Sequence, residues 1–205
     1  MPLAPEQIAD YRAQLSCGFA QLDELFPDCM SQASSTLSEA GKHDYLAGAS
    51  RICKLGWGCE PVLIFLEEMP EIAQQLGEQT LTLVADRVWE ISRSPNGRAI
   101  SPLLQSLGET ARRLGSYEQF EHYLDIVMAM ADQTTGSIHG NERTIPSPGL
   151  PDLLAKAPYL LSQLSLEGIK NWIDYGILYY KNHPDRQRDY FSLQSADSRA
   201  ILLRE

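Results

Sequence analysis

The 205-residue sequence has no apolar run long enough to cross a membrane as a helix. Its apolar runs are short, as in VLIFL at 62–66, whereas a spanning helix needs about 20 such residues. The first residues, MPLAPEQIADYRAQ, lack the basic segment and apolar core of a signal peptide. We therefore expect a soluble protein of the cytoplasm.

Motifs for catalysis and phosphate binding are also missing. The sequence contains no G-x-x-x-x-G-K-[ST] loop, no H-E-x-x-H and no G-x-S-x-G. The four histidines are scattered, and His122, beside the apolar stripe of its helix, is expected at the surface. We therefore expect no enzyme activity, no cofactor and no metal ion.

The cysteines show no metal-site spacing. The gaps between Cys17, Cys29, Cys53 and Cys59 are 12, 24 and 6 residues, so no C-x-x-C pair occurs. Cys53 falls on an apolar helical stripe, where a free cysteine behaves as a small hydrophobe. We expect four reduced, structural thiols rather than a disulfide or a zinc site.

Basic residues are scarce near the start of the chain. Residues 1–41 contain six acids and a single base, Arg12, and the formal net charge of the whole chain is −10. Such a surface repels phosphate backbones, so nucleic acid is not an expected partner. We interpret most of the acids as the solvated faces of helices.

Strand-like alternation is nearly absent, and apolar residues recur instead with a helical period. In residues 78–92, EQTLTLVADRVWEIS, they stand three, four, seven and eight positions apart, and residues 117–132 repeat this spacing. The sequence therefore predicts an all-α protein.

A helical hairpin repeats along the chain. Residues 60–77 and 98–115 superpose at an offset of 38, so that Leu66 matches Leu104; the helices that follow match at 39, so that Val88 matches Val127. A further copy begins at Leu150, and an earlier, weaker one begins at Cys29. A hairpin cannot bury its apolar face alone, so neighbouring hairpins must stack. We predict an N-terminal helix at 1–28 and a HEAT-like array of about four hairpins at 29–182, with Leu66, Leu104, Val88, Val127 and Trp172 in the core.

Glycine and proline predict the turns and bends of these hairpins. Gly77 and Gly115 follow the last periodic residue of a helix, where a positive φ closes its C-terminus. Ala40-Gly41 is expected to form the turn of the first hairpin. Three residues at equivalent points of the first helices are expected to kink or split them: Pro70, Gly108 and Pro158.

Residues 134–151, TTGSIHGNERTIPSPGLP, interrupt the array. Three glycines and three prolines exclude regular structure there. We expect an exposed loop between the third and fourth hairpins, and its role stays open between a functional loop and a simple insertion.

The C-terminal segment carries the candidate interaction residues. Trp172, Tyr175 and Tyr179 share one helix face; packing against the next helix is the ordinary explanation and a partner groove the functional one. Residues 183–205 are expected to form a connector helix that docks on the fourth hairpin. Its candidate residues are Tyr190, Phe191, Gln194, Ser195, Ser198 and Arg199.

Two segments carry a family resemblance. LSLEGIKNWIDYGI (164–177) and DRQRDYFSLQSADSRAILLRE (185–205) resemble the helical region before the metal-binding von Willebrand factor A domain in NorD/CbbO-type, CoxE-related proteins, which activate nitric oxide reductase and Rubisco. The resemblance covers roughly residues 45–205 and is most specific at YFSLQSADSRA. The D-x-S-x-S metal motif of that domain is missing, because ADSR around Asp197 has a different pattern. A family member would continue into that domain, so Glu205 is expected to be a fragment boundary.

The resemblance implies a non-catalytic adaptor or scaffold. Such a protein works with a MoxR-type AAA+ ATPase to activate or remodel a target metalloenzyme or Rubisco. The alternative is a free-standing helical-repeat module that binds other proteins. Continuation of the gene past Glu205 into a D-x-S-x-S motif would separate the two.

Overall fold

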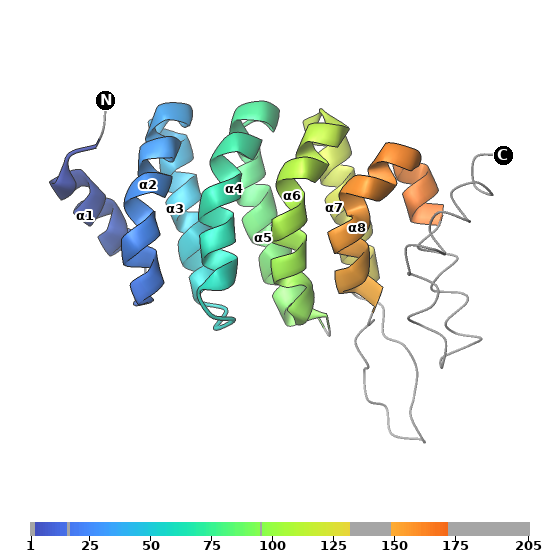
Figure 1. Ribbon diagram of the computed structural model, residues 1–205, viewed down its shortest axis with the longest axis horizontal. Helices are drawn as coiled ribbons and strands as arrows, with labels where there is room; N and C mark the ends of the chain where they lie inside the picture. Colours follow the sequence, from blue (N-terminus) through green and yellow to red (C-terminus); the bar gives the residue numbers. More distant parts are fainter. Residues whose placement is uncertain (1–2, 16, 95, 132–148, 172–205) are drawn as a thin grey trace, which may run out of the picture. The chain divides into compact units, whose positions relative to one another are not determined.

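A computed structural model describes residues 3–15, 17–94, 96–131 and 149–171, the side chains of residues 152 and 153 excepted. These residues form helices and the turns between them, with no strand, which confirms the all-α class (Figure 1). The chain divides into two compact units, Met1–Trp89 and Glu90–Glu205.

The first unit contains two successive hairpins and a preceding helix. The helices are α1 (Pro5–Gln14), α2 (Ala20–Thr36), α3 (Glu39–Cys53), α4 (Glu60–Leu76) and α5 (Gln79–Arg93), which continues into the second unit after Trp89. α4 packs against both helices of the preceding hairpin, and α1 contacts α2 and α3 (Figure 1).

The second unit repeats the arrangement. After the short 3-10 helix η1 (Gly97–Ala99) come α6 (Ile100–Leu114), α7 (Tyr117–Ala131) and α8 (Gly149–Gln163). α6 contacts α7 and packs extensively against α8. Residues 166–171 are helical again, so the second helix of the fourth hairpin begins where the repeat predicted it.

The predicted core positions are confirmed. Leu66, Leu104 and Val88 are 0% exposed and Val127 is 1% exposed. These are the positions matched between the repeats, so the repeated apolar pattern reflects repeated packing. Trp172 lies outside the described residues.

Two of the predicted turns are confirmed and one is wrong. Gly77 and Gly115 end α4 and α6 with φ values of 102° and 70°. The first hairpin turns at Leu37–Ser38, and Ala40-Gly41 lies in the first turn of α3. Ser38 Oγ accepts a hydrogen bond from Gly41 N (3.0 Å), so a serine N-cap begins α3 and no glycine is needed at the turn.

Gly41 has a different role, which involves the next hairpin. A Cβ atom at this position would lie 2.4 Å from the carboxyl carbon of Glu78. Glu78 accepts hydrogen bonds from Ser38 N (2.5 Å) and Ser38 Oγ (2.6 Å). The missing side chain therefore lets the loop between α4 and α5 dock on the start of α3.

Proline occurs inside the first helix of a hairpin at one more position than predicted. Pro70 and Pro158 lie in α4 and α8, Gly108 lies in α6, and Pro27 lies in α2; each helix is continuous, so none is split. Proline has no N–H, so Pro70 leaves the carbonyl of Leu66 without its helical donor. Tyr45 Oη of α3 donates to that carbonyl instead (2.6 Å), and burial raises the pKa of this tyrosine.

Other predicted segments are only partly described. Residues 1–28, expected to form one N-terminal helix, contain α1 and the start of α2. The predicted loop at 134–151 lies outside the described residues except for its end, where α8 begins at Gly149. The predicted connector helix at 183–205 lies outside them entirely. Within the described part of the chain, no helix has both the length and the apolar character needed to cross a membrane.

Candidate functional site

The predicted interaction residues all fall beyond the described part of the chain. They are Trp172, Tyr175, Tyr179, Tyr190, Phe191, Gln194, Ser195, Ser198 and Arg199. The structure therefore neither brings them together nor separates them, and candidate sites come from the described surface.

Trp57 is the most exposed large hydrophobic residue described. It lies in the connection between α3 and α4, with 44% of its surface exposed. Gly56 and Gly58 on either side of it have φ values of 73° and 88°, which other residues rarely adopt. An added Cβ at either glycine would meet no atom within 4 Å, so backbone conformation and not space requires glycine there. The tryptophan thus lies between two positions whose backbone conformation favours glycine.

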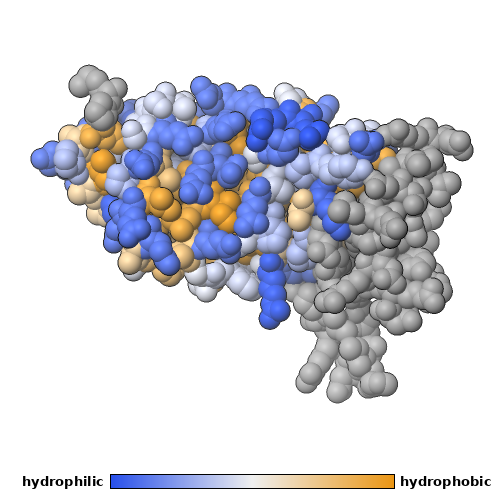
Figure 2. All heavy atoms as spheres, viewed as in Figure 1, coloured by the Kyte–Doolittle hydropathy of each residue, from blue (hydrophilic) through white to orange (hydrophobic). Residues whose placement is uncertain are grey.

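A second exposed apolar side chain lies on α2. Leu25 is 39% exposed and stands one helical turn after Gln21, whose Oε1 accepts a hydrogen bond from Cys59 Sγ (3.0 Å). That contact joins the start of α2 to the end of the Trp57 loop. Figure 2 shows hydrophobic side chains among the hydrophilic ones over α1, α2 and α4. This surface suits protein contact, since aromatic anchors supply much of the binding energy at interfaces.

A charged and aromatic cluster joins α3 to α5. Arg51 forms an ion pair with Asp86, and its guanidinium carbon lies 5.2 Å from the centre of the Trp89 ring. The Arg51 and Asp86 side chains are 40% and 44% exposed. Such a cation–π contact orients the guanidinium while its edge stays open to solvent.

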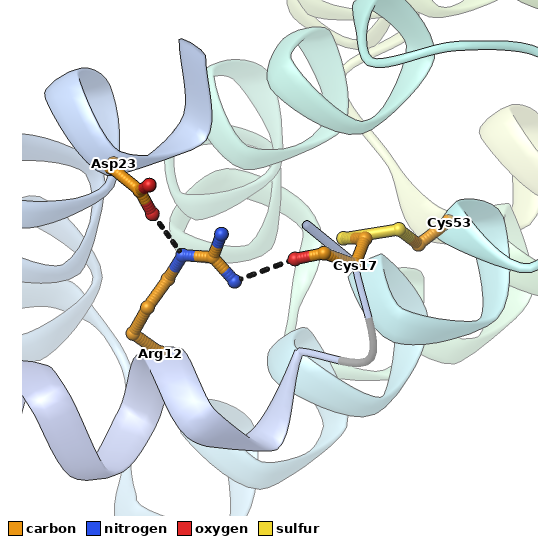
Figure 3. Close-up of a disulfide and its surroundings, with 4 residues drawn as sticks. All are labelled: Arg12, Cys17, Asp23 and Cys53. Atoms are coloured by element: carbon orange, nitrogen blue, oxygen red, sulfur yellow. Dashed lines mark hydrogen bonds and ion pairs between the residues drawn. A yellow bond between two sulfur atoms is a disulfide. The ribbon is translucent and has the colours of Figure 1, made fainter. Parts of the chain in front are cut away.

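Two cysteines near the N-terminus form a disulfide, so the expectation of four reduced thiols is wrong. Cys17 and Cys53 are bonded, with their Cα atoms 5.9 Å apart (Figure 3). Cys17 stands shortly before α2 and Cys53 is the last residue of α3. In an antiparallel hairpin the beginning of the first helix and the end of the second meet at one end. The pairing of these cysteines follows from the hairpin topology and not from their spacing in the sequence.

Arg12 joins α1 to this disulfide. Its Nη1 donates to the carbonyl oxygen of Cys17 (2.8 Å) and its Nε to Asp23 Oδ1 of α2 (2.8 Å), as Figure 3 shows. The one base among the first 41 residues thus lies where α1, α2 and the disulfide meet.

The other two cysteines are free thiols, as expected. Cys29 is buried, and burial, together with the charges of Glu67 and Asp28, raises its pKa to about 11. It is therefore protonated and inert near neutral pH. Cys59 is partly exposed.

Histidine and acidic residues form no recognisable metal centre in the described ranges. No group of three or more His, Cys, Asp or Glu side chains there is placed to hold an ion. His43 and His122 are exposed, the latter as predicted.

Comparison with known proteins gives no assignment. No protein-family model, no curated protein and no solved structure matches the chain. The NorD/CbbO resemblance therefore stays an expectation based on the segments at 164–177 and 185–205.

Proposed function

We propose that this chain is a non-catalytic adaptor or scaffold that binds other proteins through its helical hairpins. Following the resemblance, its partners are a MoxR-type AAA+ ATPase and a target metalloenzyme or Rubisco. We place it in the cytoplasm, where such an ATPase has its nucleotide.

The exposed tryptophan is the observation that supports protein binding best. Trp57 contributes little to the core, because 44% of its surface is open. Two glycines with positive φ flank it and allow the backbone conformation that leaves the indole exposed. Ordering a loop is costly in entropy, and tryptophan is the residue most enriched among strong interface contacts. A prepared anchor for a partner accounts for both features.

A direct binding measurement tests the proposal. Purified protein would be titrated with a purified MoxR-type ATPase and ATP in a calorimeter. Trp57→Ala should weaken binding by about thirtyfold, the effect of losing an interface hot spot of about 2 kcal/mol. Tyr159→Ala is the matched control, since it removes a 41% exposed aromatic side chain from the second unit. Equal affinity of wild type and Trp57→Ala would remove Trp57 from the interface, and no binding by wild type would refute the ATPase as partner.

The Arg51 cluster favours a second candidate, the free-standing protein-binding module. A guanidinium beside an indole ring and a carboxylate offers the mixed contacts that interfaces use. If this candidate is right, selection of a displayed peptide library on the wild-type protein should yield a peptide that binds it. The Arg51→Gln variant should not bind that peptide. Binding of the ATPase that is insensitive to Arg51→Gln would favour the adaptor.

A further inference from the structure

The disulfide between Cys17 and Cys53 fixes a part of the fold that has little else to fix it. α1 has ten residues, none of them buried. An isolated helix of this length is unstable in water, because its few hydrogen bonds do not offset the cost of nucleation. Its place on the first unit therefore depends on a polar contact of Tyr11 with Lys42 of α3 and on the contacts at its C-terminal end.

The contacts at the C-terminal end converge on the disulfide. Leu15, directly after α1, is buried, at 4% exposed. Arg12 donates to the carbonyl of Cys17, whose position the bond to Cys53 fixes. The remaining ion pair, from Arg12 to Asp23, has a carboxylate partner that is 65% exposed, and such pairs stabilise little.

One of the two bonded cysteines is also partly exposed to solvent. Cys17 is partly exposed in the connection between α1 and α2, whereas Cys53 is 9% exposed. A small thiol can therefore approach the bond from the Cys17 side, and nucleophile access is what makes a disulfide reducible.

We propose that Cys17 and Cys53 form a thiol-reversible latch, which a small thiol of the glutathione class opens, releasing α1 from α2 and α3. While the disulfide is closed, α1 covers the part of α2 and α3 that it contacts. Opened, it makes that surface available and leaves the hairpin of α2 and α3 in place through its own core. The inference concerns the first unit alone and does not depend on the proposed partners.

The chemistry is two successive exchanges. A thiolate attacks Cys17 Sγ, the bond to Cys53 breaks, and Cys53 leaves as a thiolate that takes up a proton. A second thiol attacks the mixed disulfide at its non-protein sulfur and releases Cys17, which is protonated in turn. The protein gains two electrons and two protons, and two molecules of the small thiol become one disulfide. Excess oxidised thiol reverses both steps.

Trypsin provides the readout, because Arg12 is the only site before Lys42. The full chain would be digested in its oxidised state and after reduction with a phosphine, and the peptide Met1–Arg12 followed by mass spectrometry. Cleavage after Arg12 requires local opening of α1. We expect it to be at least about tenfold faster in the reduced protein, with the initial rate as the measure of opening.

Variants separate the latch from a general effect of the reductant. Cys17→Ser should be cleaved rapidly with or without the phosphine. Cys59→Ser, which removes a partly exposed thiol outside the disulfide, should keep the wild-type contrast. The comparison between oxidised and reduced wild type needs no variant, so a folding defect in Cys17→Ser leaves the test intact.

Three results would overturn the proposal. One is equal cleavage after Arg12 in the oxidised and reduced proteins. Another is that the reduced protein, incubated with oxidised glutathione, does not re-form the bond between Cys17 and Cys53. Mass spectrometry would then show no loss of two hydrogens from these residues. The third is a bond that stays closed in a large excess of reduced glutathione, since that would be a fixed cross-link.

Discussion

α1 and α4 begin alike but are held in place differently. Both have proline at their first positions, Pro5 and Pro61, and an acid in the first turn. α4 then buries nine residues, whereas α1 buries none. Local signals in the sequence thus predict that a helix forms and where it begins, and they leave open what keeps it on the protein. Burial holds α4; polar contacts, Leu15 and a disulfide hold α1.

The largest expected effect tests this contrast directly. Leu66 of α4 is 0% exposed, so Leu66→Ala should lower the free energy of unfolding by about 2–5 kcal/mol through lost burial and a cavity. Ile8→Ala in α1, a partly exposed position, should cost far less. Urea unfolding followed by circular dichroism measures both. Similar losses for the two variants would mean that α1 is a packed helix after all.

A smaller but more specific effect is expected where α3 crosses α4. A Cβ atom at Gly48 would lie 2.8 Å from Phe65 Cζ and 3.2 Å from Ala85 Cβ. Gly48→Ala should therefore cost about 1–3 kcal/mol of unfolding free energy, as overpacking does. Gly18→Ala is the matched control, because an added Cβ there meets nothing within 4 Å. A Gly48→Ala variant as stable as wild type would show that the overpacking costs no more than the roughly 1 kcal/mol that alanine gains over glycine inside a helix.

The next prediction concerns the hydrogen bond from Tyr45 to the Leu66 carbonyl, which replaces the helical N–H that Pro70 lacks. Tyr45→Phe leaves the Leu66 carbonyl without its 2.6 Å partner, at a cost of about 1–2 kcal/mol. Pro70→Ala gives that carbonyl an amide donor from its own helix. In the Pro70→Ala background, Tyr45→Phe should therefore cost close to nothing.

A double-mutant cycle in urea measures this coupling between Tyr45 and Pro70. Equal costs of Tyr45→Phe in both backgrounds would mean that the tyrosine does not substitute for the proline's missing N–H. The cycle also controls for the small volume change, since the hydroxyl is removed in both arms.

Much of the fold was predictable because the apolar stripes in the sequence are the helix faces that the fold buries. Leu66, Val88 and Leu104 were identified from spacing alone and are fully buried. The turn at Gly115 was predictable because a left-handed C-terminus favours glycine. Periodicity and glycine chemistry are local properties, which a sequence displays directly.

The errors arose where the cause is not local. Gly41 suggested a turn, but its missing side chain instead leaves room for the carboxyl group of Glu78, which lies 37 positions later in the chain. The partner of Cys17 depended on hairpin topology and not on the gaps between cysteines. The predicted interaction site stays a prediction, because the aromatic residues from Trp172 onward lie outside the described residues.

The smallest predicted effect concerns the contact of Glu78 with Ser38. Hydrogen bonds from the Ser38 hydroxyl and then its backbone N–H lower the pKa of the Glu78 carboxyl below its usual value of 4.5. A carboxyl with a lowered folded-state pKa stabilises the protein above its unfolded pKa, and this stabilisation is lost as pH falls through the folded pKa. Urea unfolding at a series of pH values should show wild type more stable than Glu78→Gln at pH 7. The stability difference between wild type and Glu78→Gln should narrow below about pH 4.5.

Glu24→Gln, which removes the same charge from an exposed position on α2, should show no such narrowing, because Glu24 does not contact Ser38. A gap between wild type and Glu78→Gln that widens toward low pH would reverse the sign of the argument, and the α4–α5 loop would then not be anchored on α3 by a charged carboxylate.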